Sequence, residues 1–204
     1  MYTAKSFRND NSEDVKNFIH ANGFGILTSQ VENKPWATHI PMFLSEDGST
    51  LTGHIARGNK HWKSFESNPD ALAIFSGPHT YISSSWYDHE NVPTWNYIAV
   101  HISGNLKIME AEDLLESLKN LTDKYEKASA CPVSVEKMTP DLLKRDIAGI
   151  VGFQLQIEKI ESSYKLSQNR DDENHNRIIV ELEKRGDKDA LKIARAMKEF
   201  RTHF

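Results

Sequence analysis

The sequence predicts a mainly β protein with flanking helices, an α+β chain whose centre is an antiparallel sheet or barrel. Short segments rich in β-branched and aromatic residues follow one another in the first half of the chain, and hairpin-length turns separate them. One long segment near the middle repeats its apolar residues at helical spacing. Two more helical segments close the chain.

The N-terminal part begins with a predicted amphipathic helix over residues 10–22, which places Val15, Phe18 and Ile19 on one face. Asn22-Gly23 ends this helix. Turn residues then separate three predicted strands, at residues 24–30, 36–44 and 50–56. Consecutive strands with such short connections pair as an antiparallel sheet.

The middle part alternates a short helix with further strands. Residues 59–67 predict a helix of about two to three turns, which Asn68-Pro69 ends. Strands are then predicted at residues 71–75, 80–86 and 94–108. A polar loop over residues 88–91 precedes the last of these strands.

The clearest helix spans residues 111–126, with Leu114, Leu118 and Leu121 on one face. A loop, a helical turn and a strand are expected after it, at residues 128–139, 141–145 and 149–160. The chain closes with two helices, at residues 174–185 and 188–201, joined at Gly186-Asp187. Ile193, Met197 and Phe200 form a packing stripe on the second of them.

The composition excludes several classes of protein. The 204 residues carry a formal net charge of −4, and the pI is about 6.1. The chain therefore lacks the excess of positive charge that is typical of nucleic-acid-binding proteins. The single cysteine, Cys131, rules out an intrachain disulfide. The N-terminus lacks the apolar core of a signal peptide, and the longest apolar run, residues 147–153, is too short to span a bilayer. We therefore expect a cytoplasmic protein without a membrane segment.

Aromatic residues and cations gather in one stretch, residues 53–103. This stretch holds three of the four tryptophans together with several tyrosines, histidines and lysines. A core built only for packing uses leucine, isoleucine and valine instead. Aromatic faces, clustered hydroxyls and a few cations suit a flat aromatic ligand with an anionic tail.

The first candidate site is Arg57-Gly58-Asn59-Lys60, between a strand and a short helix. Free backbone N–H groups and the positive end of the helix dipole attract an anion at such a position, and Lys60 adds a full charge. Asn59 caps the helix and Gly58 permits a tight turn. A solvated turn with surface charges is the alternative interpretation.

Three further polar groups lie near this stretch. Strand alternation puts Tyr81, Ser83 and Ser85 on one face, where they suit a phosphate or ribityl chain or simply face solvent. In the strand that follows, Asn96 carries an amide that suits the edge of a heterocycle. Residues 164–170 mix cations and amides, as a site-closing segment or an ordinary polar loop does.

The sequence predicts no metal site, because the nine histidines lack ligand spacing. Cys131 has no adjacent histidine and is not expected to be a nucleophile. His39 and His54 lie near the presumed site, but the sequence identifies no general acid or base. The sequence therefore assigns no catalytic residues.

Seven segments of the chain together resemble the PaiB-like family of FMN-binding split-barrel proteins, described as negative transcriptional regulators. The matching segments run over nearly the whole chain: residues 1–2, 38–41, 53–62, 77–87, 92–97, 150–152 and 165–170. Parts of the pattern also look like the wider group that includes the pyridoxamine-phosphate oxidases.

The resemblance implies a six-stranded antiparallel split barrel with C-terminal helices, formed by residues 1–170 and followed by a helical extension at 171–204 that packs on the barrel. It also implies a homodimer with FMN bound at its interface. The implied FMN contacts are Thr38, His39 and Ile40 along the ring, Asn59 and Lys60 at the phosphate with Arg57 close by, Thr94, Trp95 and Asn96 at the next edge, and Lys165 and Gln168 from the partner subunit. Ser83 is a further candidate contact, from the strand alternation alone.

One departure from the wider group bears on the phosphate. The oxidases use a Ser-Arg-Lys turn where this chain has Asn59-Lys60-His61, and a histidine is mostly neutral at pH 7. Only one certain cation remains at this turn, and a lysine cannot form the bidentate fork of arginine. The resemblance therefore leaves the affinity for phosphate lower than in an oxidase.

The resemblance favours a negative transcriptional regulator or a flavin-dependent sensor. An FMN-dependent oxidoreductase, either a flavin reductase or an oxidase of a small substrate, is the alternative, because fold does not establish function. Direct DNA binding is disfavoured. The two C-terminal helices carry five acids among eight cations, and their apolar stripe suits packing on the barrel.

Overall fold

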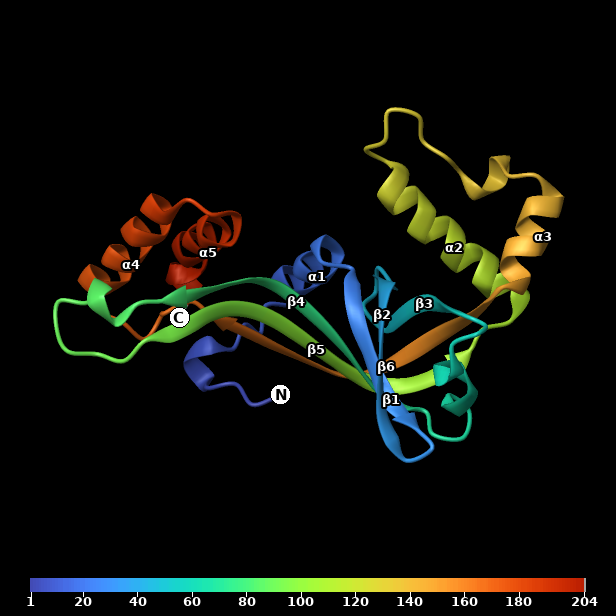
Figure 1. The fold of residues 1–204 in the computed structure, drawn as a ribbon, viewed down its shortest axis with the longest axis horizontal. Coiled ribbons are helices and arrows are strands. Elements are labelled where there is room, and N and C mark those ends of the chain that lie inside the picture. Colours follow the sequence, from blue (N-terminus) through green and yellow to red (C-terminus); the bar gives the residue numbers. More distant parts are fainter. Residues whose placement is uncertain (204) are drawn as a thin grey trace. The chain divides into compact units, whose positions relative to one another are not determined.

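The computed structural model describes residues 1–203 (Figure 1). The chain forms two compact units, which share the three longest strands. The barrel unit comprises residues 16–75 and 101–160. The extension unit comprises residues 1–15, residues 76–100 and the chain from residue 161 onward. The predicted domain boundary between residues 170 and 171 stays a prediction.

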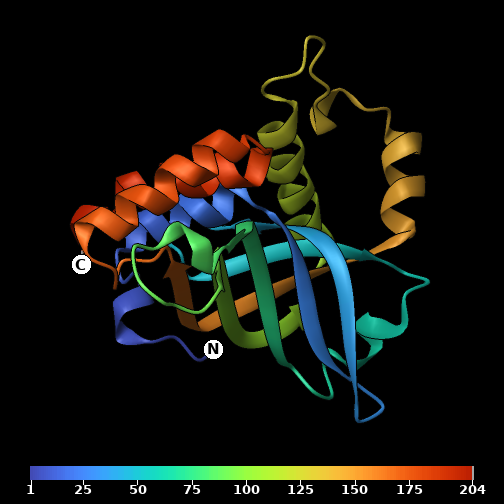
Figure 2. The ribbon, with the colours of Figure 1, turned by 60° about the vertical axis from the view of Figure 1, so that its left-hand side comes forward.

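Six antiparallel strands close the barrel in the order β1-β2-β3-β6-β5-β4. They are β1 (Phe24–Val31), β2 (Lys34–Leu44), β3 (Thr50–Ala56), β4 (Asp70–Ile82), β5 (Thr94–Ile108) and β6 (Ile150–Lys165). Figure 2 shows strands of the barrel side by side, with the tip of the β1–β2 hairpin projecting at one end. The predicted six-stranded antiparallel barrel with flanking helices is confirmed.

The helices are α1 (Ser12–Ala21), α2 (Ala111–Glu126), α3 (Pro140–Ala148), α4 (Asp172–Arg185) and α5 (Lys188–Glu199). Short 3₁₀ helices lie at η1 (Lys5–Phe7), η2 (Lys60–Ser64), η3 (Ser84–Trp86), η4 (Val135–Lys137) and η5 (Phe200–His203). Within residues 1–203, no helix is both long enough and apolar enough to cross a bilayer.

The β1–β2 hairpin has a two-residue turn, Glu32-Asn33, in which both residues have positive φ. Such a turn matches the right-handed twist of the two strands. The register then pairs Pro35 with Gln30 and Pro41 with Phe24. Counting from the turn, both prolines occupy non-hydrogen-bonded positions, where the missing N–H costs nothing.

Strand β2 is only partly paired on its other side. It meets β3 from Met42 to Leu44 and no further, so residues 34–41 form an open edge. The alternation of the β1–β2 ladder turns the N–H groups of Ala37 and His39 away from β1 and toward this edge. The edge of β2 at residues 34–41 therefore carries strand N–H groups that the β1–β2 ladder does not use.

The extension unit is built on the C-terminal helices. Ile178 and Leu182 of α4 and Ile193 and Met197 of α5 are fully buried, which confirms the predicted packing role of Ile193 and Met197. Gly186 joins the two helices in the left-handed conformation, with φ at 70°. The helix pair therefore buries its apolar faces inside its own unit.

Candidate cofactor site

A cleft of about 810 Å³ lies in the barrel unit, between the β1–β2 hairpin and the turn that follows β3. It is lined by Val31, Glu32, Lys34, Trp36, Ala37, Thr38, His39, Gly58, Asn59 and Lys60. The cleft therefore brings together Thr38, His39, Asn59 and Lys60, four of the predicted site residues. Its volume lies within the range of roughly 300–1,000 Å³ that is usual for small-molecule sites.

The turn on one side of the cleft differs from its predicted form. The helix expected over residues 59–67 is a 3₁₀ helix of five residues, Lys60–Ser64, which is too short for a useful dipole. Asn59 still caps it, because its Oδ1 accepts from the backbone N–H of His61 at 3.0 Å. Attraction for an anion therefore rests on side-chain charge.

The hairpin supplies a cation that sequence reasoning missed. Lys34, the first residue of β2, lines the same cleft as Lys60, and both side chains are exposed. Trp36, 38% exposed, adds an aromatic face on the same side of β2. The sequence alone does not pair Lys34 with Lys60, because 25 residues separate them. The strand register of the hairpin is the signal that could have placed Lys34 at the cleft.

Two other predicted residues of the barrel unit do not line the cleft. The guanidinium of Arg57 donates to the carbonyls of Ala148 and Ile150, each at 2.8 Å. Its backbone carbonyl accepts from the indole of Trp62 at 2.9 Å. Arg57 thus fixes the end of β3 just before Gly58. Ile40 is buried, with 6% of its surface exposed.

The other six predicted residues belong to the extension unit. Lys165 Nζ donates to Thr94 Oγ1, and partial burial, followed by the charge of Arg170, lowers the pKa of Lys165. Trp95 is 53% exposed and packs edge to face on Tyr81. These three side chains leave part of their surface accessible.

Asn96 and Gln168 use their amides within the extension unit. Asn96 is fully buried and accepts from Ser167 Oγ at 3.1 Å, and its amide nitrogen lies 3.6 Å from Met197 Sδ. Gln168 accepts from the backbone N–H of Leu166 and donates to the carbonyl of Tyr164. Both amides therefore hold the loop that follows β6.

The strand predicted over residues 80–86 forms at Tyr81 but not at Ser83 or Ser85. Strand β4 ends at Ile82, and Ser83 instead caps η3 by accepting from the N–H of Ser85 at 3.2 Å. The run of three serines competes with the strand ladder, because serine hydroxyls bond to nearby backbone groups. The three polar side chains therefore do not form one row.

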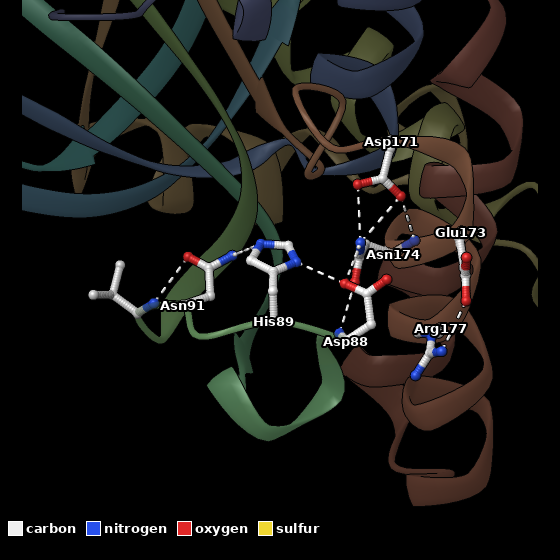
Figure 3. A network of polar contacts seen from close by, with 8 residues as sticks. Asp88, His89, Asn91, Asp171, Glu173, Asn174 and Arg177 are labelled. Atoms are coloured by element: carbon white, nitrogen blue, oxygen red, sulfur yellow. Dashed lines mark hydrogen bonds and ion pairs between the residues drawn. The ribbon is translucent and has the colours of Figure 1, made fainter.

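A polar network joins the loop after η3 to the start of α4 (Figure 3). The buried Asn174 accepts from the N–H of Asp88 at 3.1 Å and donates to its carboxylate at 3.0 Å. Asn174 also binds Asp171, the residue that caps α4. His89 contacts the same Asp88 carboxylate at 2.6 Å, and these contacts lower the pKa of Asp88.

We expect Asn174→Ala to lower the free energy of unfolding of the extension unit by about 1–3 kcal/mol, because it removes a buried amide that hydrogen-bonds the carboxylates of Asp88 and Asp171. Chemical denaturation and hydrogen exchange at the first turn of α4 measure this loss. Asn176→Ala, at an exposed position of the same helix, is the matched control. Equal effects of the two substitutions would contradict the role of the network.

The cleft of the barrel unit fits an aromatic ligand with an anionic tail. Lys34 and Lys60 match a phosphate, which carries close to two negative charges at pH 7. The unpaired N–H groups of Ala37 and His39 match the acceptor atoms at the edge of a flavin ring. Trp36 offers the ring an aromatic face. The lining carries two lysines against one acid, Glu32, and this net positive charge, the donors and the volume agree with FMN.

Comparison with known proteins identifies the family. The model for the family described as "Putative FMN-binding domain" matches residues 1–159. The Protease synthase and sporulation protein PAI 2 of Bacillus subtilis is 42% identical over 201 residues, which cover 98% of this chain and 97% of that protein.

Two solved structures share the fold. The FAD and heme binding protein from Mycobacterium smegmatis superposes with a TM-score of 0.62 at 12% identity, over 78% of this chain and 73% of that one. The flavocytochrome Anf3 from Azotobacter vinelandii gives a TM-score of 0.61 at 17% identity, over 83% and 75%. The family match and the identity to PAI 2 show that the chain belongs to the family of FMN-binding domains related to PAI 2, and its cofactor is FMN.

Proposed function

We propose that the cleft of the barrel unit binds FMN, with the phosphate at Lys34 and Lys60 and the ring along the open edge of β2. The observation that supports this placement is the meeting of two lysines with unpaired strand donors in one cleft. Bound FMN supplies one- and two-electron chemistry, while the chain supplies charge, donors and orientation. Thr38 and Asn59 supply neutral polar contacts between the two ends.

We further propose that the protein is a homodimer, in which a second copy closes the cleft. Thr94, Trp95 and Lys165 of that copy are suitable contributors, because their side chains stay partly accessible. Lys165 adds a third cation to the site. Sedimentation of the FMN-loaded protein tests this assembly. A monomer that keeps its FMN bound during sedimentation would contradict it.

The role we propose is that of a flavin-dependent regulator or sensor. The name of the PAI 2 relative refers to a protease synthase and to sporulation, and a regulatory role for this chain is compatible with that name. We propose no direct DNA contact by α4 and α5, because five acidic residues lie among the eight basic residues between positions 174 and 204. Salt-dependent binding to duplex DNA would overturn that part of the proposal.

An FMN-dependent oxidoreductase is the second candidate. The exposed imidazole of His39, which lines the cleft and stacks on Phe24 with ring centres 6.4 Å apart, favours it. An imidazole beside the flavin edge is able to bind or exchange a proton with a small substrate. The reduction of bound flavin by NADPH or NADH distinguishes this candidate from a sensor without turnover.

The absorption spectrum of the purified protein tests the proposal as a whole. We expect a flavin spectrum, and we expect the chromophore released by denaturation to be FMN rather than riboflavin. Steady consumption of NADPH by the loaded protein would favour the oxidoreductase over the sensor. A colourless protein that takes up no added FMN would exclude both candidates.

A further inference from the structure

The imidazole of His61 lies directly behind the cleft and is fully buried, with 0% of its surface exposed. Both of its ring nitrogens have partners. Nε2 lies 2.8 Å from Ser29 Oγ on β1, and Nδ1 lies 2.9 Å from Thr38 Oγ1 on β2. His61 is not part of the cleft lining, although Thr38 is.

The contacts continue from Thr38 into the turn. Asn59 Nδ2 donates to Thr38 Oγ1 at 3.2 Å, while Asn59 Oδ1 accepts from the backbone N–H of His61. Since Thr38 Oγ1 already accepts from Asn59, its own hydrogen is available to the Nδ1 of His61. That assignment leaves the ring proton on Nε2, where it is donated to Ser29.

The ring stays neutral in this position. Burial lowers the pKa of His61 to about 4, and no nearby charge contributes to the shift. The side chains that face the ring, Ser29 of β1, Thr38 and Trp36 of β2 and Phe65 after η2, are all uncharged. A neutral imidazole carries one donor and one acceptor, which is what its two hydroxyl partners require.

We propose that His61 is the positioning residue of the cofactor cleft. One imidazole ties together β1, β2 and the turn at residues 58–60, which are the three segments that line the cleft. These hydrogen bonds fix the orientation of the Thr38 hydroxyl and the Asn59 amide, which are the neutral polar groups proposed to contact FMN. This inference rests on the FMN site proposed above.

Two substitutions separate this role from simple packing. His61→Phe keeps the ring volume and the packing on Phe65 but loses both hydrogen bonds. His61→Asn loses volume but places a carboxamide where Nδ1 stood, and so keeps the bond to Thr38. We expect His61→Phe to raise the dissociation constant for FMN by about 10-fold or more, as loss of a supporting contact does at other sites. We expect His61→Asn to recover most of that loss.

Additional variants keep the test decisive if His61→Phe fails to fold. Ser29→Ala removes one partner of the ring and leaves the Thr38–Asn59 link intact, so it should change FMN affinity by less than about threefold. Thr38→Val should weaken FMN binding by more in the wild type than in a His61→Leu background, which cannot bond to Thr38, because the contacts act as one unit. Additive effects would overturn the proposal.

Fluorescence titration with FMN and hydrogen exchange of the cofactor-free protein are the two readouts. Faster exchange of the residue-61 backbone N–H in His61→Phe, but not in His61→Asn, supports the tie even without FMN. Wild-type affinity in His61→Phe, or equal losses in both variants, overturns the positioning role while the FMN site stands. Absence of FMN binding by the wild type overturns the proposed function instead.

Discussion

Replacing both Lys34 and Lys60 by alanine should weaken FMN binding by about 100-fold or more. Hydrogen bonds to charged groups contribute about 1.5–3 kcal/mol each, which is roughly a 10- to 100-fold change in affinity for each lysine. Each single substitution should therefore produce a measurable part of the loss. Quenching of flavin fluorescence during titration of the cofactor-free protein gives the dissociation constants.

Lys63→Ala is the matched control for this prediction. Lys63 lies in the same short helix as Lys60, but its ammonium lies 6.0 Å from the centre of the Trp62 ring and does not line the cleft. We expect its FMN affinity to stay within about twofold of the wild type. If the double variant behaves like Lys63→Ala, the phosphate does not lie between Lys34 and Lys60.

Gly104→Ala should lower the free energy of unfolding of the barrel unit by about 3 kcal/mol or more. A Cβ atom at Gly104 on β5 would lie 2.0 Å from the backbone carbonyl oxygen of Gln156 on β6. Neither strand backbone can move aside without breaking the ladder that closes the barrel. Denaturant titration followed by tryptophan fluorescence measures the loss.

Gly149→Ala provides the comparison for Gly104→Ala. Its Cβ would meet only the carbonyl of Asp146, at 3.4 Å, and the φ of −83° suits any residue. We expect a change of less than about 1 kcal/mol at this position. A barrel that tolerates alanine at both positions would show that β5 and β6 do not approach each other as closely as described.

The amphipathic elements could be predicted closely from the sequence. The strand at residues 94–108 and the helix at residues 111–126 have the predicted bounds, because their apolar periods are long, although Gly104 interrupts that of the strand. Strand β4 was predicted as two pieces, since Ser76-Gly77-Pro78 reads as a turn. In the structure the ladder runs through this segment, because tertiary pairing outweighs local propensity.

Four of the ten residues that line the cleft were among the site residues expected from the sequence. Thr38, His39, Asn59 and Lys60 do meet in one cleft, as the resemblance implied. The other lining residues could not be predicted, because a sequence pattern does not show in which direction a side chain points. The guanidinium of Arg57 binds backbone carbonyls instead of lining the cleft. The second cation of the cleft is Lys34, which belongs to the β1–β2 hairpin and not to the turn after β3.

Binding of FMN and of riboflavin to the cofactor-free protein shows whether the cleft holds FMN through its phosphate. The two ligands share the ring and the ribityl chain, so a difference in affinity reports the phosphate alone. We predict that the cofactor-free protein binds FMN at least about 10-fold more tightly than riboflavin. Equal affinity for the two, or no binding of either, would contradict the account.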